Sequence, residues 1–180
     1  SEVNKPRYYR MIAGTCVSNL ISDNVKQSNN RVICGDVLSG TKINREGYLG
    51  FYDTQITVIK EGDQEEFLGW ILPGFDKFSL SKSYVSWLFP KRKYEIDTNM
   101  RGEERAYVVT GQYEEVLPMN IFPQQLIKAI MIEDIDLMEK LGLYELAPED
   151  MALCEFVCTS KIEVQSIIRY GLDLLRKENL

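Results

Sequence analysis

Two cysteines near the end of the chain have a spacing that could hold an iron–sulfur cluster. Cys154 and Cys158 lie within P-E-D-M-A-L-C-E-F-V-C-T-S-K-I, residues 148–162. Bacterial cluster-binding segments run C-x2-C-x2-C-x3-C-P, and each cysteine sulfur ligates an iron. When the last cysteine is placed at Cys158, the other three ligand positions fall on Pro148, Met151 and Cys154. Half of the ligands of such a motif are therefore missing.

The same two thiols could instead pack as small apolar residues inside a helical bundle, because free cysteine is among the most buried residue types. A cluster needs about four ligands, and the chain has no histidine that could replace a missing thiol. One helical turn holds Cβ atoms about 6 Å apart, whereas a disulfide requires about 3.8 Å. We therefore favour packing roles for Cys154 and Cys158, and likewise for Cys16 and Cys34.

The first part of the chain, residues 1–117, is predicted to be a β-rich domain. The spacing of hydrophobic residues changes from that of a strand to that of a helix and back within the first 34 residues. This order is typical of a β-grasp unit. Two hairpins are expected beyond it, because runs of β-formers flank turn residues. The expected elements are a strand at 7–13, a helix at 17–25, a strand at 31–34, and hairpins that pair 55–60 with 66–72 and 94–98 with 105–110.

Residues 118–180 predict a small helical bundle. A first helix follows Pro123, which suits the first helical turn, and a second runs over 133–141 and ends at Gly142. Pro148 opens a third helix. Ser160 and Glu163 have the S-x-x-E spacing of a capping box at the start of the last helix.

Two further stretches allow a binding role. The run of glycines between Gly35 and Gly50 could cradle a ligand, although loop geometry alone also explains it. Residues 87–93, W-L-F-P-K-R-K, could lie against a membrane surface or an acidic partner; we favour a buried strand end followed by a solvated basic turn. Adjacent acids on strands point to opposite faces, so the three Glu-Glu pairs are expected to be solvated rather than catalytic.

Composition excludes several classes of protein. The net charge of −6 and the pI of about 4.9 argue against a nucleic-acid binder, which needs an excess of Lys and Arg to neutralise phosphates. No apolar run approaches the roughly 20 residues that span a bilayer, and no signal-peptide pattern or nucleophile motif is present. The chain begins with Ser1 rather than Met, and we expect it to be a piece of a longer protein.

Several long stretches, in one order, resemble the C-terminal part of the A subunit of the sodium-translocating NADH:quinone oxidoreductases. They are R-V-I-C-G-D-V-L-S-G (31–40), Y-L-G-F-Y-D-T-Q-I-T-V-I-K-E-G (48–62), G-W-I-L-P-G-F-D-K-F-S (69–79), E-R-A-Y-V-V-T-G-Q-Y-E-E-V-L-P-M-N-I-F-P (104–123) and E-D-M-A-L-C-E-F-V-C (149–158). The resemblance extends more weakly to the C subunit of the Rnf electron-transport complex and to the flavin subunit of complex I.

Those weaker relatives imply a second cluster motif. In the Rnf protein, P-M-x-x-x-P-Q-Q-L follows a cluster segment, and this chain has P-M-N-I-F-P-Q-Q-L at 118–126. The spacing then places the four ligand positions on Tyr107, Thr110, Tyr113 and Leu117, none of which is a thiol. Two degenerate motifs imply the remains of a two-cluster ferredoxin domain.

The resemblance implies an α+β fold: an SLBB-like β-grasp domain with hairpin elaborations over 1–117, followed by a degenerate iron–sulfur domain of helices over 118–180. It implies a docking piece of a peripheral subunit at the cytoplasmic face of the bacterial inner membrane. Its partners would be the other subunits, above all the membrane-embedded B subunit, and flavins and iron–sulfur clusters would belong to those subunits. We expect no catalytic, cofactor-binding or metal-ligating residue within this piece.

Two rival hypotheses remain open at this stage. The chain could be a β-grasp module that contributes to quinone binding in the complex, or a redox protein with a labile cluster.

Overall fold

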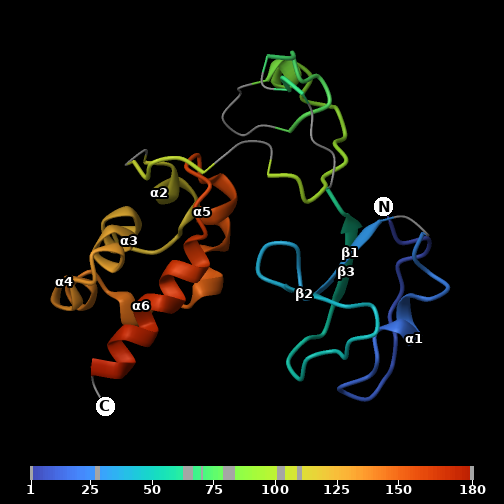
Figure 1. Ribbon diagram of the computed structural model, residues 1–180, viewed down its shortest axis with the longest axis horizontal. Coiled ribbons are helices and arrows are strands. Elements are labelled where there is room, and N and C mark those ends of the chain that lie inside the picture. Colours follow the sequence, from blue (N-terminus) through green and yellow to red (C-terminus); the bar gives the residue numbers. More distant parts are fainter. Residues whose placement is uncertain are drawn as a thin grey trace. The chain divides into compact units, whose positions relative to one another are not determined.

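The computed structural model describes residues 2–26, 29–62, 67–69, 71–78, 84–100, 104–108 and 111–178. The chain has an α+β fold with a three-stranded antiparallel sheet and several short helices (Figure 1), as the sequence predicts at this level. It divides into two compact units, Ser1–Arg101 and Gly102–Leu180. Residues 104–117, which the sequence analysis assigns to the β-rich domain, include side chains that pack in the helical unit.

The sheet of the first unit is built around its central strand, β1 (Asn30–Cys34). One neighbour is β2 (Thr41–Ile43) and the other is β3 (Ile56–Lys60), both antiparallel to β1. Val32 faces Ile43 on one side and Val58 on the other. The strands are rich in β-branched residues, which fit a pleated and half-buried surface.

A small core lies against this sheet. The short helix α1 (Ser18–Ile21) contributes Leu20 and Ile21, which pack with Val17 and Val32. Partly buried side chains complete this cluster: Met11, Val25, Ile43 and Ile56.

Several of the predicted β elements are wrong. No strand forms at 7–13, and helix α1 is shorter than the expected 17–25. The strand at 56–60 exists, but its partner is β1 rather than 66–72, of which residues 67–69, 71 and 72 form turns and bends. The second hairpin is also absent from the described residues: at 94–98 only Asp97 forms an isolated bridge, with Lys60, and 104–108 has no strand. Positions 66, 109 and 110 lie outside the described residues.

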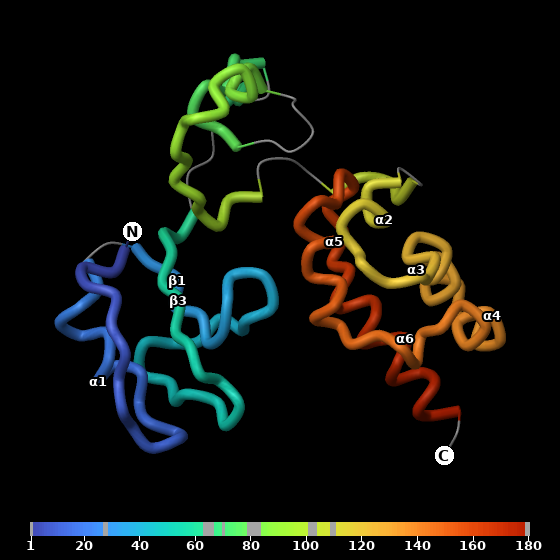
Figure 2. The backbone as a smooth tube through the Cα atoms, turned by 180° about the vertical axis from the view of Figure 1, so that it is seen from behind, coloured from blue at the N-terminus to red at the C-terminus, as the bar shows by residue number. Residues whose placement is uncertain are grey.

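The second unit consists of helices that contact one another around α6 (Val164–Glu178), as the tube in Figure 2 shows. Helix α6 contacts α3 (Pro123–Met131), α4 (Ile135–Lys140) and α5 (Ala152–Val157). Helix α2 (Gln112–Val116), which the sequence analysis did not predict, contacts α5. The described residues also form 3-10 helices: η1 (Val85–Leu88) in the first unit, and η2 (Leu143–Glu145) and η3 (Pro148–Met151) in the second.

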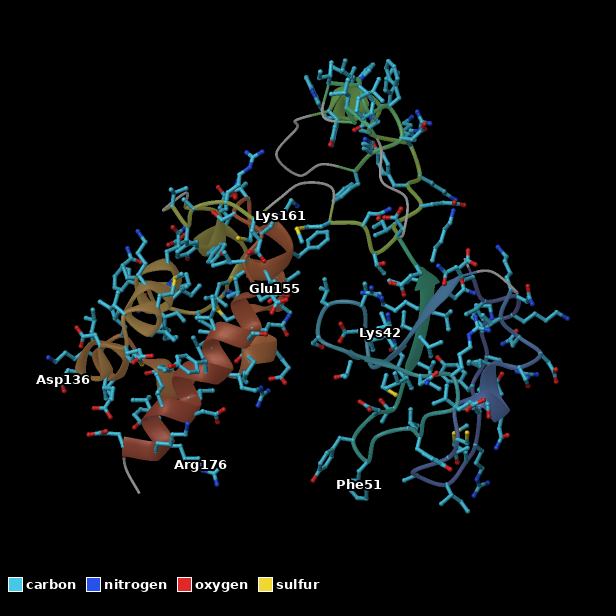
Figure 3. All side chains as sticks on the ribbon, viewed as in Figure 1. Lys42, Phe51, Asp136, Glu155, Lys161 and Arg176 are labelled. Carbon is cyan, nitrogen blue, oxygen red and sulfur yellow. The ribbon has the colours of Figure 1, made fainter. Side chains whose placement is uncertain are left out.

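Local signals explain where these helices begin and end. Pro123 and Pro148 occupy first-turn positions, as predicted, and Gly142 ends the α4 region with a φ of +86° that glycine adopts without strain. Asp136 lies in the first turn of α4 and Arg176 in the last turn of α6 (Figure 3), where each charge complements the helix dipole.

The predicted capping box is wrong. The Ser160 hydroxyl donates instead to the carbonyl of Ala106, at 3.1 Å. The N–H of Gln165, in the first turn of α6, donates to the carboxylate of Glu155, at 2.8 Å. A side chain from the preceding helix therefore accepts a backbone N–H at the start of α6. The S-x-x-E spacing is coincidental here.

Close packing also restricts α6 in its middle. A Cβ placed on Gly171 would lie 2.9 Å from the Cδ1 of Ile130 and 3.0 Å from the Cδ2 of Leu143. The absence of a side chain at this position thus allows α6 to lie close to α3 and η2.

Candidate functional site

The second degenerate motif forms one buried face of consecutive helical turns. Pro148 and Met151 lie on η3, Cys154 lies on α5 and Cys158 is the C-cap residue of α5. The spacing of three, three and four residues is that of a single helical face. Met151 and Cys154 have no exposed surface, and Cys158 is 6% exposed. The spacing of a cluster motif is therefore also the spacing of a packing face.

The first degenerate motif lies against the second. Tyr113 is on α2 and is 2% exposed, and Leu117 caps that helix and is also buried. Tyr107 is partly buried against the same core, while Thr110 lies outside the described residues. The thiol of Cys154 lies 3.9 Å from the carbonyl oxygen of Tyr113, 41 positions earlier in the chain. The structure thus brings the two motifs together, a contact that no local feature of the sequence predicts.

Two tyrosine rings occupy positions at which a cluster protein would have thiols. The rings of Tyr107 and Tyr113 have centroids 6.1 Å apart and are tilted by 39°. Their hydroxyl oxygens are both buried, and neither makes a hydrogen bond of normal geometry to a described residue. Burial is the main cause that raises the pKa of both phenols, and the nearby Cys158 raises it further. Both phenols are therefore neutral.

The thiol of Cys154 is also held in its protonated form. Burial raises its pKa to about 11, and the negative charge of Glu114 adds to this shift. Since the thiolate is the form that binds metals and acts as a nucleophile, this surrounding disfavours both roles.

The donor set does not fit an iron–sulfur cluster. Described ligand positions supply two thiols, two phenols, and the apolar side chains of Leu117, Pro148 and Met151, whereas a cluster of this kind is held by four thiolates. Within the described ranges, no group of three or more His, Cys, Asp or Glu side chains is arranged to hold a metal ion. We derive no redox step through these residues.

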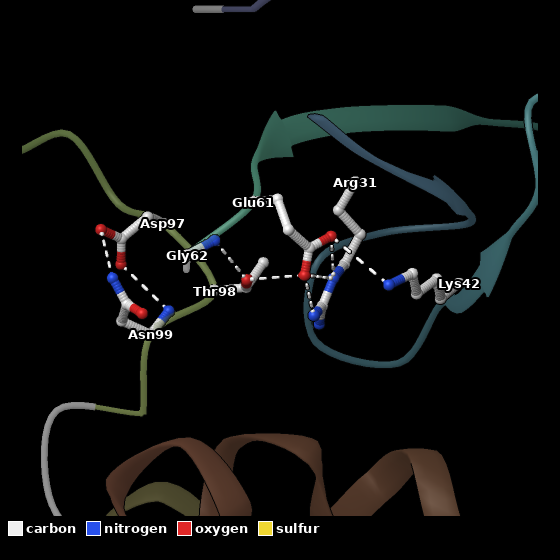
Figure 4. Close-up of polar contacts among 7 residues, drawn as sticks. All are labelled: Arg31, Lys42, Glu61, Gly62, Asp97, Thr98 and Asn99. Atoms are coloured by element: carbon white, nitrogen blue, oxygen red, sulfur yellow. Dashed lines mark hydrogen bonds and ion pairs between the residues drawn. The ribbon is translucent and has the colours of Figure 1, made fainter. Parts of the chain in front are cut away.

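A polar cluster in the first unit was missed by the sequence analysis (Figure 4). The guanidinium of Arg31 on β1 forms a bidentate ion pair with Glu61, which follows β3. Lys42 on β2 also contacts Glu61, at 3.4 Å, and Thr98 donates a hydrogen bond to it. The hydrogen bonds from Arg31, together with the positive charges of Arg31 and Lys42, lower the pKa of Glu61 to about 2.

The geometry of this cluster links the sheet to a distant segment. Because Arg31 pairs with Ile59 in the ladder, Glu61 is its diagonal neighbour on the same face. The hydroxyl of Thr98 also accepts the N–H of Gly62, at 2.8 Å. No local sequence signal marks this arrangement, because its members come together only when the strands pair.

The glycine-rich stretch forms a tight loop that uses its own N–H groups. The carboxylate of Asp36 accepts hydrogen bonds from the N–H groups of Leu38 and Ser39 and from the Ser39 hydroxyl. A Cβ at Gly40 would collide with the carbonyl oxygens of Cys34 and Asp36. The loop geometry accounts for the glycine at Gly40. The N–H groups of Leu38 and Ser39 already donate to Asp36, so they do not bind a ligand.

The stretch at 87–93 differs from the buried strand end that we favoured. Residues 85–88 form the 3-10 helix η1, and Trp87, Leu88 and Phe89 are each about half exposed, at 51%, 54% and 49%. The three cations that follow are exposed as well. The prediction of a buried strand end is therefore wrong, because the residues before the cations form a half-exposed 3-10 helix, whereas the solvated basic turn is confirmed.

A cavity of about 550 Å³ in the first unit has strongly charged walls. It is lined by Glu2, Val58, Ile59, Lys60, Asp76, Arg92, Lys93, Tyr94, Glu95, Ile96 and Asp97. Small-molecule sites are mostly lined by apolar and aromatic side chains with few polar groups. This cavity is therefore a poor match for the ring of a quinone. A smaller hollow of about 350 Å³ in the helical unit includes Ile162, Ile167 and Tyr170.

Of the helices in the described ranges, none combines the length and hydropathy that crossing a bilayer requires.

Comparisons with known proteins find a matching family model and several similar relatives. Residues 1–45 match the SLBB family described as the NQRA C-terminal domain. The chain is 45% identical over 179 residues to the A subunit of the Na(+)-translocating NADH-quinone reductase of Rhodopirellula baltica, a match that covers 98% of the chain and 39% of the relative. It is 43% identical over 178 residues to the protein of that name from Pasteurella multocida, and 40% identical to that from Shewanella frigidimarina. In both, 98% of the chain and 40% of the relative are covered. The chain spans about two-fifths of the length of these relatives.

Proposed function

The chain belongs to the family of A subunits of the Na(+)-translocating NADH-quinone reductases, and we propose that it is a docking and stiffening piece of such a subunit. In this proposal it carries no redox centre, and hydride, electron and sodium chemistry take place elsewhere in the complex. The subunit lies at the cytoplasmic face of the inner membrane and contacts the other subunits, above all the membrane-embedded B subunit.

The packing of the two degenerate motifs carries this proposal. Tyr113 and Leu117 from one motif and Met151, Cys154 and Cys158 from the other belong to one buried core. Side chains that fill the core of a unit contribute to its rigidity, because the interior is close-packed and a change of even one methylene group disturbs the packing. The former ligand positions therefore serve to hold helices together.

The proposal also concerns the origin of the two parts of the fold. We propose that residues 1–117 contain an SLBB-type β-grasp domain, and that residues 118–180, together with the motif at 107–117 that packs on them, derive from a two-cluster ferredoxin domain that has lost its ligands. The family match over residues 1–45 supports the first part. The close contact between the two motifs supports the second, because two clusters in such a domain would require neighbouring ligand sets.

The proposal is tested in the full-length subunit within the assembled complex. Replacing both Cys154 and Cys158 by Ala removes every thiol from the two motifs. We expect the purified complex to contain the subunit in the same ratio and to transfer electrons from NADH to quinone at the same rate. An assembled complex that has lost electron transfer would overturn the structural role of these thiols.

Two other hypotheses make different predictions. A quinone-binding module would bind a soluble quinone analogue saturably and with one-to-one stoichiometry as the isolated chain, whereas the docking piece would show binding only in the assembled complex. A protein with a labile cluster would contain iron after anaerobic purification. The charged walls of the 550 Å³ cavity and the incomplete thiol set favour the docking role over both.

A further inference from the structure

We call residues 67–93 the basic aromatic segment. Its described residues expose many more large apolar side chains than a water-facing segment needs. Single exposed apolar residues are normal, but a contiguous run marks an interaction surface. The exposed members are Phe67, Leu68, Ile71, Leu72, Phe75, Phe78, Val85, Trp87, Leu88 and Phe89. The two tryptophans of the chain, Trp70 and Trp87, both fall within this segment.

Hydrogen bonds hold the frame of the segment. Ser86 is 2% exposed, and its hydroxyl donates to the carbonyl of Lys77, at 2.6 Å. The hydroxyl of Tyr94 donates to the carbonyl of Ser86, and the N–H of Val85 donates to the carbonyl of Pro73. These bonds fix η1 beside the turn at 73–77, and the apolar side chains are left on the outside.

The charge of the segment is opposite to that of the chain. The chain has a net charge of −6, but between Phe67 and Lys93 the only acid is Asp76. Asp76 forms an ion pair with Arg92, so its charge is compensated. The cations of the segment are Lys77, Lys82, Lys91, Arg92 and Lys93. Lys91 and Lys93 are exposed beside the aromatic side chains of η1 and Phe89.

We propose that the basic aromatic segment docks on an anionic phospholipid surface. Its Trp and Phe rings would enter the headgroup region, where amphipathic rings are favoured, and Lys91 and Lys93 would contact lipid phosphates. Apolar insertion combined with cation attraction is the usual basis of reversible membrane binding. The aromatic side chains would also suit a protein interface, but the Lys residues beside them are depleted at such interfaces, which favours lipid phosphates. The inference rests on the proposed function, which places the subunit at the cytoplasmic face of the inner membrane.

Vesicle binding of the 180-residue chain tests the proposal. The chain is mixed with vesicles of phosphatidylcholine alone or with added phosphatidylglycerol, and the bound fraction is measured by sedimentation and by tryptophan fluorescence. We expect binding to the anionic vesicles only, a blue shift of the emission, and loss of binding at high salt. Because both tryptophans lie in the segment, the shift reports on the segment itself.

Variants locate the binding. Lys91→Gln with Lys93→Gln should weaken partitioning about 10- to 30-fold, on the basis of about 1 kcal/mol for each cation near the surface. Trp87→Ala should weaken it about tenfold, since the ring no longer enters the interface. The matched control is Lys140→Gln with Lys177→Gln, which removes the same charge from the helical unit and should leave partitioning unchanged.

Three outcomes would overturn the inference: no binding to anionic vesicles, equal binding to neutral vesicles, or equal losses in both double variants. Capture of the membrane-embedded B subunit through Lys91 and Lys93 without any vesicle binding would also overturn it and would assign the surface to a protein. If the chain fails to bind vesicles while the Cys154→Ala, Cys158→Ala complex assembles and functions, the lipid surface alone is wrong and the docking function stands.

Discussion

The thiol of Cys154 lies 3.9 Å from the carbonyl oxygen of Tyr113, so the two sets of predicted cluster positions meet in one core. Each set has the spacing of a cluster motif, but its described side chains make packing contacts. This contact implies that the residues of the two sets should behave as core residues, with measurable effects on stability and reactivity.

Removing the buried hydroxyl of Tyr113 should stabilise the chain. The oxygen has no hydrogen-bond partner of normal geometry among the described residues, and burying such a group costs about 1–3 kcal/mol. Tyr113→Phe should therefore raise the free energy of unfolding by about 1 kcal/mol in urea denaturation. Tyr144→Phe is the control, because its exposed hydroxyl donates to Glu139. A loss of stability in Tyr113→Phe would mean that the hydroxyl has a partner.

The four cysteines should differ strongly in their reactivity with a thiol reagent. Cys16 is partly exposed, whereas Cys154 is fully buried and has a pKa of about 11. At pH 8, about one Cys154 side chain in a thousand would be a thiolate even if it were accessible. Alkylation followed by peptide mass spectrometry should show modification of Cys16 long before that of Cys154. Early modification of Cys154 in the folded chain would contradict its burial.

The ion pair between Arg31 and Glu61 should make stability depend on pH in the acidic range. The pKa of Glu61 is about 2 in the folded chain, below its ordinary value of 4.5. A lowered pKa stabilises the folded state fully above about pH 4.5, and this contribution is lost as the pH falls from 4.5 toward 2. For a partly exposed pair we expect a contribution of about 1–2 kcal/mol.

Glu61→Gln should remove this part of the pH dependence and lower the stability at pH 7. Urea denaturation at pH 7, 4.5 and 3 would measure both effects. Glu46→Gln, at an exposed position outside the cluster, should leave the pH profile as it is. If the Glu61→Gln variant lost as much stability in acid as the unchanged chain does, the pH dependence would come from other carboxylates.

Packing around α6 gives a further prediction. Gly171→Leu would place a large side chain against Ile130 and Leu143, where even a Cβ lies within 3.0 Å of their atoms. Overpacking of this kind costs about 1–3 kcal/mol. Asp173→Leu, on the exposed side of the same helix, should change the free energy of unfolding by less than about 0.5 kcal/mol. Similar values for both variants would contradict the close approach of α6 to α3 and η2.

The sequence predicted the helical unit better than the sheet, for a physical reason. Pro123, Gly142 and Pro148 act through their own backbone dihedrals, so their helix boundaries can be read locally. The pairing of β3 with β1 joins segments far apart in the chain, and nothing in 56–60 alone distinguishes β1 from the following residues as its partner. The expected hairpins were wrong on this account.

The candidate site was predicted in part. The set at 107–117 was identified through the resemblance to the Rnf protein. The other set was identified from spacing, but the spacing of Pro148, Met151, Cys154 and Cys158 is equally that of a helical face. Spacing alone therefore could not separate ligation from packing. The pairing of Glu61 with Arg31, and the exposure of Trp87, depend on which segments cover one another, and no local signal carries that information.

The iron and acid-labile sulfide content of the anaerobically purified chain tests the central claim most directly, with the Cys154→Ala, Cys158→Ala variant as its control. Our account predicts far less than one iron per chain, no broad absorption near 400 nm (about where cluster charge transfer falls), and equal values in chain and variant. Stoichiometric iron and sulfide in the chain, lost in the variant, would contradict the account and assign a cluster to these residues.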